Sequence, residues 1–261
     1  MSALFVERVA QLLATQRYGR SLVQLASTAS TNDDARRAAE QDVSAGHVIV
    51  ADAQTQGRGA RARSWSSPAG LDLYLSIVDR LPVQLAELPP LTLAVGLGVA
   101  SAVDALLGGC AAPSQVKWPN DVLISGRKCA GILLETQSGL DAVVIGIGLN
   151  VNRREFSEEL RELATSLAVA RGGAEPFDRN QVLATLLGAV ERSVDRFVAE
   201  GAAAIASALT ARLAWVGQPA RCGDLQGIVR GVDAQGALLI ETARGIERAI
   251  AGRLEPLPAP G

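Results

Sequence analysis

The stretch KWPNDVLISGRKCAGILLE, residues 117–135, contains two strand-like runs, DVLI and CAGILL, in close succession. The Ser125-Gly126 pair between them is typical of a tight turn, so the segment predicts a β-hairpin. In such a hairpin Asp121 and Lys128 would lie across from each other. A lysine that follows a turn is usually exposed at the surface. Here an apolar run follows Lys128, which indicates that its ammonium group is partly buried.

Lysine is rare in this chain. Of its 25 basic residues only Lys117 and Lys128 are lysines, and both lie in the hairpin segment. Codon usage by itself is enough to explain the bias toward arginine, without any functional reason. A lysine that persists against the bias is nevertheless a candidate for a role that needs a compact ammonium group, which a planar guanidinium cannot replace.

Strand-like and helix-like segments surround the hairpin. Strands are expected at 21–27, 47–52, 71–79, 115–119 and 142–151, with Ser138-Gly139 as a second tight turn. Helices are expected at 3–15, after residue 30, at about 84–107 and over most of 157–212. For the helix after residue 30, Thr31 or Asn32 can serve as the cap and Gly46 as the end. After Trp215 the pattern changes to short alternating strands with glycine-rich turns, which predicts a small barrel beginning near residue 214.

Composition excludes several classes of function. A chain of 261 residues with 48% hydrophobic and 20% charged residues is typical of a globular protein, and a net charge of −2 argues against a general nucleic-acid binder. No secretory signal is recognisable, and the uncharged run Leu88–Val103 is judged too short and too broken to span a bilayer. Three widely spaced cysteines predict free thiols in a reducing cytoplasm. With His47 as the single histidine, neither a Ser-His-Asp triad nor a histidine zinc site is expected.

A second polar segment, QTQGRGARARSW (54–65), directly follows a predicted buried strand. A solvated loop, a nucleic-acid tail or a grip for a small phosphorylated molecule would each explain it. Glycines let backbone N–H groups approach an anion, and guanidinium groups match phosphate oxygens. The Ser-Thr-Asn sequence at 30–32 is similarly open: these side chains can cap a helix, or line a pocket for an uncharged polar group.

Taken in order, these pieces resemble the biotin–protein ligases. The resemblance runs through STN, QTQGRGARARSWSSPAGLDLYLS, KWPNDVL, GRKCAGILLE and VIGIGLNVN over residues 30–152, in a form without an N-terminal DNA-binding domain. It implies an α+β fold. A mixed-sheet catalytic domain of the biotin/lipoate ligase type would occupy 1–213 and bind biotin and the adenylate, and an SH3-like barrel would occupy 214–261.

The resemblance also implies roles for individual residues. Ser30, Thr31, Asn32 and Gln54 would contact the ureido ring of biotin, and Lys128 would meet its carboxylate and the α-phosphate of ATP. Further biotin contacts would come from the following residues: Gly57, Arg58, Gly59, Ala60 and Gly131. The expected ATP and adenylate contacts are Arg61, Arg63, Trp65, Asn120 and Asn150. Arg58 would also handle phosphates and assist catalysis, and Asp121 would take the proton of the acceptor amine.

The implied activity is the ATP-dependent formation of biotinyl-5′-AMP and its transfer to a lysine of a biotin carboxyl carrier protein in the cytoplasm. Mg²⁺ would enter with ATP and not through a dedicated protein cage. No DNA or membrane partner is expected, and a homodimer is left open. Two alternatives remain: a lipoyl or octanoyl transferase of the same architecture, and a biotin-binding regulator. Ala60 and Ala62 depart from the family's Gly-Arg-Gly-Arg-Arg-Gly-Arg pattern, which predicts weaker retention of the intermediate.

Overall fold

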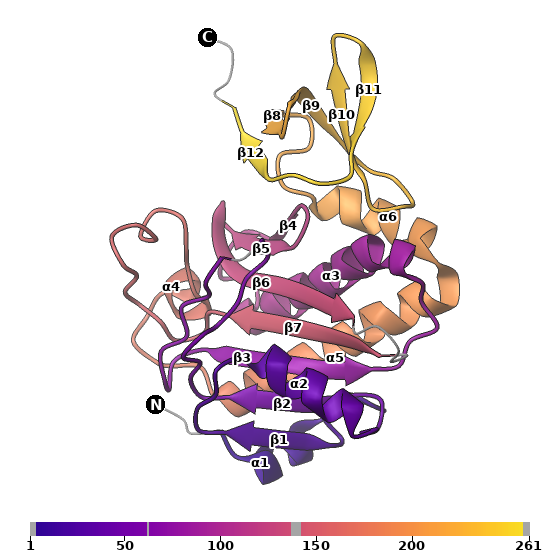
Figure 1. The fold of residues 1–261 in the computed structure, drawn as a ribbon. Helices are drawn as coiled ribbons and strands as arrows, with labels where there is room; N and C mark the ends of the chain where they lie inside the picture. The colour runs from indigo at the N-terminus through magenta and orange to yellow at the C-terminus, as the bar shows by residue number, and fades with distance from the viewer. Residues whose placement is uncertain (1–3, 62, 137–141, 258–261) are drawn as a thin grey trace.

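The computed structural model describes residues 4–61, 63–136 and 142–257 of the chain. A seven-stranded sheet with helices on both faces forms its larger part, and a five-stranded sheet follows at the C-terminal end (Figure 1). The α+β fold with a mixed sheet, expected from the sequence, is confirmed. The expected turn at Ser138-Gly139 and the substituted position Ala62 lie outside the described residues.

The large sheet is mixed because β1 runs parallel to β2, whereas the other neighbouring pairs are antiparallel. In spatial order its strands are β1 (Leu22–Leu25), β2 (His47–Ala51), β3 (Leu73–Asp79), β7 (Val143–Leu149), β6 (Arg127–Thr136), β5 (Asp121–Ile124) and β4 (Gln115–Lys117). All residues of β2 and β3 are buried, as their continuous apolar sequences predict for strands covered on both faces. The central strands therefore have helices on either side.

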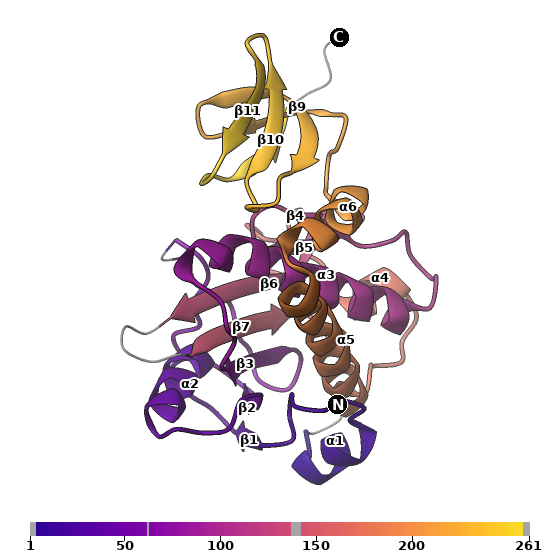
Figure 2. The same cartoon turned by 90° about the vertical axis from the view of Figure 1, so that its right-hand side faces the viewer.

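Helices cover the two faces of this sheet unequally. They are α1 (Val6–Leu12), α2 (Thr31–Glu40), the 3₁₀ turn η1 (Leu85–Glu87), α3 (Leu88–Leu107), α4 (Leu167–Arg171), α5 (Arg179–Glu200) and α6 (Ala202–Arg212). The main core packs α3 and α5 against one face, and a small second core packs α2 against the other (Figure 2). On β7, Ile145 belongs to the first core and Val144 to the second, as strand alternation requires. Residues 158–163, within the predicted helical region, form turns instead.

Helix α3 corrects one expectation from the sequence. The uncharged run that begins at Leu88 was judged too short and too broken to span a bilayer, yet α3 is an unbroken helix of 20 residues. Its prolines stand in the first turn, where a missing N–H costs no helical hydrogen bond. By length and composition α3 could cross a membrane, but 72% of its apolar window is buried inside the protein. It is the central core helix of this fold.

The start of α2 also differs from expectation. Ser30, and neither Thr31 nor Asn32, occupies the N-cap position, and its side chain makes no capping hydrogen bond. Thr31 and Asn32 are buried in the first helical turn, where their side chains bond to other elements of the protein. The helix ends at Glu40, before the predicted Gly46, which accommodates a positive φ of 83° in the following loop. The polar side chains at 30–32 are therefore available for a site.

The hairpin of β5 and β6 is present but irregular. A bulge between Val122 and Leu123 pairs Asp121 with Gly131 and Leu123 with Lys128, so the expected direct pairing of Asp121 with Lys128 is wrong. Their side chains meet all the same, with Nζ of Lys128 2.5 Å from Oδ1 of Asp121. The bulge shifts the register of the two strands by one residue.

The C-terminal sheet is antiparallel and forms the SH3-like unit expected from the sequence. Its strands are β8 (Pro219–Cys222), β9 (Leu225–Val232), β10 (Leu238–Thr242), β11 (Gly245–Ala249) and β12 (Leu254–Pro256), in the spatial order β11-β10-β9-β8-β12. It stands beyond α6 and β4 (Figure 1). The buried indole of Trp118 donates from Nε1 to the carbonyl of Gly236, at 2.9 Å, in the turn between β9 and β10. That turn also packs on Pro90 at the start of α3, which leaves no room for a Cβ at Gly236.

Replacing Trp118 with Phe tests this anchor. The variant leaves the buried carbonyl of Gly236 without its donor, which we expect to lower the free energy of unfolding by about 1–3 kcal/mol. Urea unfolding followed by circular dichroism measures the change. As a control, Ile246→Ala on the exposed edge of β11 is expected to have an effect close to zero. An unchanged free energy in Trp118→Phe would show that the indole does not anchor the small sheet.

Candidate active site

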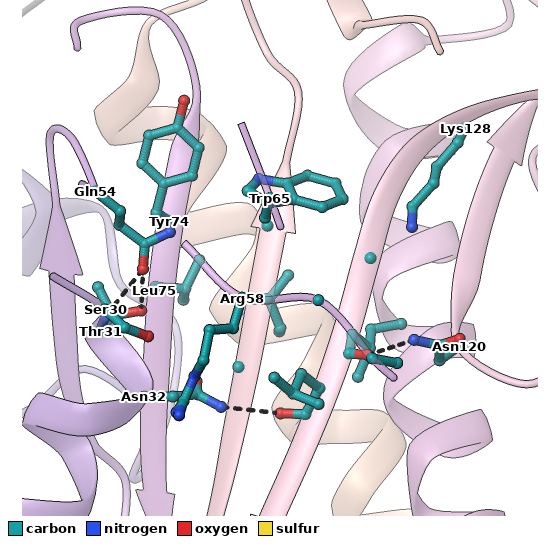
Figure 3. Close-up of a pocket in the computed structure, with 18 residues that line it drawn as sticks. Ser30, Thr31, Asn32, Gln54, Arg58, Trp65, Tyr74, Leu75, Asn120 and Lys128 are labelled. Atoms are coloured by element: carbon teal, nitrogen blue, oxygen red, sulfur yellow. Dashed lines mark hydrogen bonds between the residues drawn. The ribbon is translucent and has the colours of Figure 1, made fainter. Parts of the chain in front are cut away.

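A pocket, called here the central pocket, lies where the start of α2, the loop 54–67 and strands β3, β6 and β7 meet (Figure 3). Many of the residues singled out from the sequence line it: Ser30, Thr31, Asn32, Gln54, Arg58, Gly59, Ala60, Trp65, Asn120, Lys128 and Gly131. The sequence did not point to seven others: Tyr74, Leu75, Ile132, Leu133, Gly146, Ile147 and Gly148. All seven lie on strands β3, β6 and β7, and the sheet register brings them to the pocket. Leu75, Ile132 and Ile147 also belong to the main core, on the other face of the sheet.

Three glycines on β6 and β7 form the floor of the central pocket. A Cβ at Gly148 would lie 2.5 Å from Cε2 of Trp65, and a Cβ at Gly131 would lie 2.9 Å from the same indole. At Gly146 a Cβ would lie 2.2 Å from Oδ1 of Asn32. None of the three has a positive φ, so the backbone conformation does not require glycine. Space does: any side chain here would displace Trp65 or Asn32.

Polar side chains gather at one end of the pocket. Gln54 accepts a hydrogen bond from the backbone N–H of Thr31 at 2.9 Å, and its Nε2 donates to Ser67 at 2.9 Å. Buried Ser76 places its hydroxyl 2.8 Å from that of Thr31 and 2.6 Å from Oδ1 of Asn32. Asn32 in turn donates from Nδ2 to Glu135 at 2.8 Å. Ser76 and Glu135 were not predicted as site residues, because both lie within runs that indicate ordinary strands.

Arg58 belongs to this polar end of the pocket. Its Nη2 lies 2.9 Å from Oδ1 of Asp33 and 3.0 Å from Oε2 of Glu135, so the guanidinium bridges α2 and β6. In Figure 3 Arg58 lies beside Asn32, whereas Lys128 projects into the pocket at the far side. The structure therefore separates two cations that the sequence placed together as catalytic residues.

Lys128 is held by two contacts at the opposite end. Its Nζ pairs with Asp121 at 2.5 Å and lies 5.1 Å from the ring centroid of Trp65. The Lys128 side chain is 27% exposed and that of Asp121 only 11%. Asn120, next in sequence to Asp121, donates from Nδ2 to the carbonyl of Ile132 at 2.8 Å, which fixes its side chain against β6. The expectation of a partly buried ammonium group is confirmed.

A second hollow, the outer cleft, opens on the other side of Lys128. It is the larger of the two, with about 1560 Å³ of space against about 440 Å³ for the central pocket, open mouths included. Four residues line both hollows: Gly59, Ala60, Trp65 and Lys128. Asp121, Arg63 and Asn150, expected at the site, line only the outer cleft. The small C-terminal sheet contributes Arg253, Glu255 and Pro256.

The second lysine, Lys117, also lines the outer cleft. Its Nζ lies 5.3 Å from the ring centroid of Trp215, and burial lowers its pKa from the ordinary value although nearby Asp121 opposes this. Both lysines of the chain therefore face the same hollow. The single histidine does not, because His47 begins β2 and pairs its Nδ1 with the hydroxyl of Ser21 at 2.7 Å.

Three of the expected site residues make contacts elsewhere. Arg61 donates to the carbonyl of Gly252, so it links the loop to the small sheet. Gly57 packs against the returning chain, where a Cβ would lie 2.5 Å from the carbonyl oxygen of Trp65. Although Asn150 lines the outer cleft, its Nδ2 donates inward to the carbonyl of Thr165 at 2.9 Å. Each of these contacts depends on the tertiary structure and could not be inferred from the sequence.

A buried ion pair that the sequence did not reveal supports the far end of the loop. Arg153 pairs with Asp72 at 2.6 Å and donates to the carbonyl of Ser66 at 2.8 Å, next to Trp65. Both side chains of the pair are nearly inaccessible. Within the described residues there is no group of three or more His, Cys, Asp or Glu side chains that could hold a metal ion.

Replacing Gly148 with Ala tests the glycine floor. The added methyl group needs the space of the Trp65 ring, so we expect the indole to leave the pocket while the fold remains. Acrylamide quenching of tryptophan fluorescence should increase. Gly188→Ala in α5, where only the end of Arg192 lies near, is the control and should leave quenching unchanged. If acrylamide quenches Gly148→Ala to the same extent as the unmodified protein, the position of Trp65 does not depend on the glycine floor.

Comparison with known proteins shows which protein families this chain resembles. Residues 24–152 match the model of the Biotin/lipoate A/B protein ligase family, and residues 221–253 match the Biotin protein ligase C terminal domain. The chain is 37% identical over 241 residues to the biotin--[acetyl-CoA-carboxylase] ligase of Mycobacterium tuberculosis, covering 88% of this chain and 87% of that protein. It is 34% identical over 252 residues to the bifunctional ligase/repressor BirA of Bacillus spizizenii, covering 93% and 76%.

A solved structure agrees with these relatives. The biotin protein ligase from Aquifex aeolicus in complex with biotin and ATP superposes with a TM-score of 0.80 at 31% identity, covering 90% of this chain and 98% of that one. Both the large sheet and the small C-terminal sheet thus have their counterparts in known ligases. The chain belongs to the biotin protein ligase family.

Proposed function

We propose that this protein activates biotin with ATP to form biotinyl-5′-AMP and pyrophosphate, and then transfers biotin to a lysine of a biotin carboxyl carrier protein. One observation carries the proposal: Lys128 lies where the central pocket and the outer cleft meet. A carboxylate that arrives from one side and a phosphate that arrives from the other would come together at its ammonium group. That is where the first step requires positive charge.

The central pocket suits biotin because its two ends differ. Thr31, Gln54 and Ser76 form an uncharged polar end that matches the ureido ring. Lys128 provides a cation for the carboxylate at the other end. Between them lies the glycine floor, and the fused rings of biotin would rest on it once the Trp65 indole moves off Gly148. The outer cleft is the larger hollow, and we assign it to ATP, with Trp65 beside the adenine and Arg63 near the phosphates.

The first step needs charge neutralisation and no general base. A carboxylate oxygen of biotin attacks the α-phosphorus of ATP, and the bond to the pyrophosphate oxygen breaks. The carboxylate is already a nucleophile, so the single histidine can lie elsewhere. Lys128 offsets the repulsion between the two anions, and Mg²⁺ bound to ATP supplies further positive charge. Arg58 closes the ureido end of the pocket, where it is paired with Asp33 and Glu135. To contact the phosphates, Arg58 would have to break both of these ion pairs.

In the second step the amine of the acceptor lysine attacks the carbonyl carbon of the mixed anhydride, and AMP leaves. The attacking amine must lose a proton, and we assign its acceptance to Asp121, whose carboxylate borders the outer cleft. Because Asp121 is paired with Lys128, the departure of AMP changes the electrostatic surroundings of both groups. The small sheet contributes Arg253 and Glu255 to the same cleft, which supports a role for this sheet in receiving the carrier protein.

We further propose that the catalytic unit spans residues 1–213 and the SH3-like unit 214–261. The protein acts in the cytoplasm, where its free thiols at Cys110, Cys129 and Cys222 stay reduced. Its macromolecular partner is the carrier protein, and we propose no DNA or membrane partner. Whether two copies associate as a homodimer is open to direct mass measurement.

The activity is tested by incubating the protein with ATP, Mg²⁺, biotin and a biotin carboxyl carrier domain. We expect the mass of the carrier to increase by that of biotin less water, on one lysine, with release of pyrophosphate. A lipoyl domain offered with lipoate or octanoate is the comparison for the alternative transferase activity. Modification of the lipoyl domain with the biotin carrier left unmodified would contradict the proposal.

Lys128→Ala is expected to abolish adenylate formation while the fold remains intact, because it removes the cation between two anions. Lys128→Arg should also be severely impaired, since a planar guanidinium does not fit the position between Asp121 and the Trp65 ring. Pyrophosphate release measures both variants, and Lys117→Ala serves as the matched lysine control. Wild-type rates in Lys128→Arg would show that a compact ammonium group is not required.

Ala60 lies where the two hollows meet. The family pattern that the sequence resembles has arginine at this position. An added arginine could form a charge-assisted hydrogen bond to the intermediate, worth about 1.5–3 kcal/mol. We therefore expect Ala60→Arg to slow dissociation of preformed biotinyl-5′-AMP by roughly 10- to 150-fold. Stopped-flow dissociation measures the rate. Equal rates in both proteins, with no biotin on bystander proteins, would show that Arg58, Arg61 and Arg63 already suffice.

A further inference from the structure

A row of hydrogen-bonding groups runs beneath the polar end of the central pocket, from Glu135 through Asn32 and Ser76 to Thr31. Oε2 of Glu135 accepts from Nδ2 of Asn32 at 2.8 Å. Oδ1 of Asn32 lies 2.6 Å from the hydroxyl of Ser76, which lies 2.8 Å from the hydroxyl of Thr31. Asn32, Ser76 and Thr31 are each at least 96% buried, so water does not reorder the row.

The chemistry of Glu135 fixes the direction of every bond in this row. A carboxylate only accepts hydrogen bonds, so Asn32 must direct its NH₂ group toward Glu135 and its carbonyl oxygen toward Ser76. The carbonyl of Leu133 accepts from the same NH₂ group at the longer distance of 3.4 Å and favours the same orientation. That oxygen only accepts, so the single hydroxyl hydrogen of Ser76 goes to Asn32. The Ser76 and Thr31 oxygens, 2.8 Å apart, then need the hydrogen of Thr31 between them. Thr31 is left with lone pairs facing the pocket.

The opposite order can be excluded. If Ser76 gave its hydrogen to Thr31, two oxygens would lie 2.6 Å apart with no hydrogen between Ser76 and Asn32. Oε1 of Gln54 accepts the backbone N–H of Thr31 at 2.9 Å and has a second lone pair, so it is the competing acceptor for the Thr31 hydroxyl hydrogen. The hydroxyl of Thr31 is farther from Gln54, at 3.2 Å, than from Ser76.

We propose that Glu135 is a specificity-determining residue, which sets the hydrogen-bond polarity of the pocket so that Thr31 accepts from a ligand N–H. A cyclic urea, with an N–H on each side of its carbonyl, satisfies this acceptor, whereas a ring with oxygen in that place does not. Glu135 acts through Asn32 and Ser76, and so positions the pocket without touching the ligand. The inference rests on the proposed function only in taking biotin as the ligand.

Glu135→Gln removes the constraint with little change of shape. An amide can present either its oxygen or its NH₂ group to Asn32, so the row can reverse and release the Thr31 hydrogen toward the pocket, at the loss of the long bond from Asn32 to the carbonyl of Leu133. The variant also weakens the bond to Arg58, which has to be separated from the effect on Asn32. Asp33→Asn is the matched control: it removes the other carboxylate paired with Arg58 at 2.9 Å and leaves the row intact.

The experiment is calorimetry without ATP, with biotin and its two cyclic carbamate analogues, in each of which oxygen replaces one ureido N–H. In the wild type we expect one analogue, the one that lacks the N–H facing Thr31, to bind about tenfold or more weakly than biotin. In Glu135→Gln that ratio should fall to about threefold or less, and in Asp33→Asn it should stay at the wild-type value. Unfolding midpoints confirm that all three proteins are folded.

Two outcomes would overturn the inference: an unchanged ratio in Glu135→Gln, or an equal fall of the ratio in Asp33→Asn. The first would mean that Glu135 does not orient the row, and the second that only the charge around Arg58 matters. A double variant adds a check, because the ratio between biotin and the analogue in Asn32→Ala should not change when Glu135→Gln is added. Failure of the wild type to bind biotin would instead contradict the proposed function and is recognised at once.

Discussion

The site depends on the absence of side chains at Gly131, Gly146 and Gly148. These positions lie on β6 and β7 in the middle of the large sheet, where a side chain would otherwise belong to the core. Because they are glycines, the start of α2 and the indole of Trp65 can approach the sheet backbone closely. A pocket therefore forms on the sheet itself, and rigid strands set the distance between its polar end and Lys128.

The glycine–arginine segment 57–65 serves chiefly to join parts of the molecule. Arg58 links it to α2 and β6 through two carboxylates, and Arg61 links it to the small sheet at Gly252. Arg153 holds its far end at Ser66. These three arginine contacts hold the loop over the place where the two hollows meet. Closure over a ligand would exchange these protein contacts for contacts to the ligand, at a cost offset by binding.

Much of this was predictable because it depends on local pattern. Alternating apolar runs indicated the strands, the turn pairs indicated hairpins, and the rarity of lysine singled out Lys128. The bulge that shifts the register of β5 against β6 was not predictable, because no residue in DVLI is typical of a bulge. Ser76 and Glu135 were missed because a polar residue in a strand usually faces solvent. Arg58 was assigned to phosphates because its carboxylate partners come from 25 residues before it and 77 after it.

The most direct test of the account is a crystal structure of the protein with biotin. The account predicts the ureido ring beside Thr31, the bicyclic ring over Gly146 and Gly148, and a carboxylate oxygen within about 3 Å of Nζ of Lys128, a normal hydrogen-bond distance. Biotin in the reversed orientation, with its carboxylate among Thr31 and Gln54, would contradict the account. So would biotin bound in the outer cleft with the central pocket still closed by Trp65.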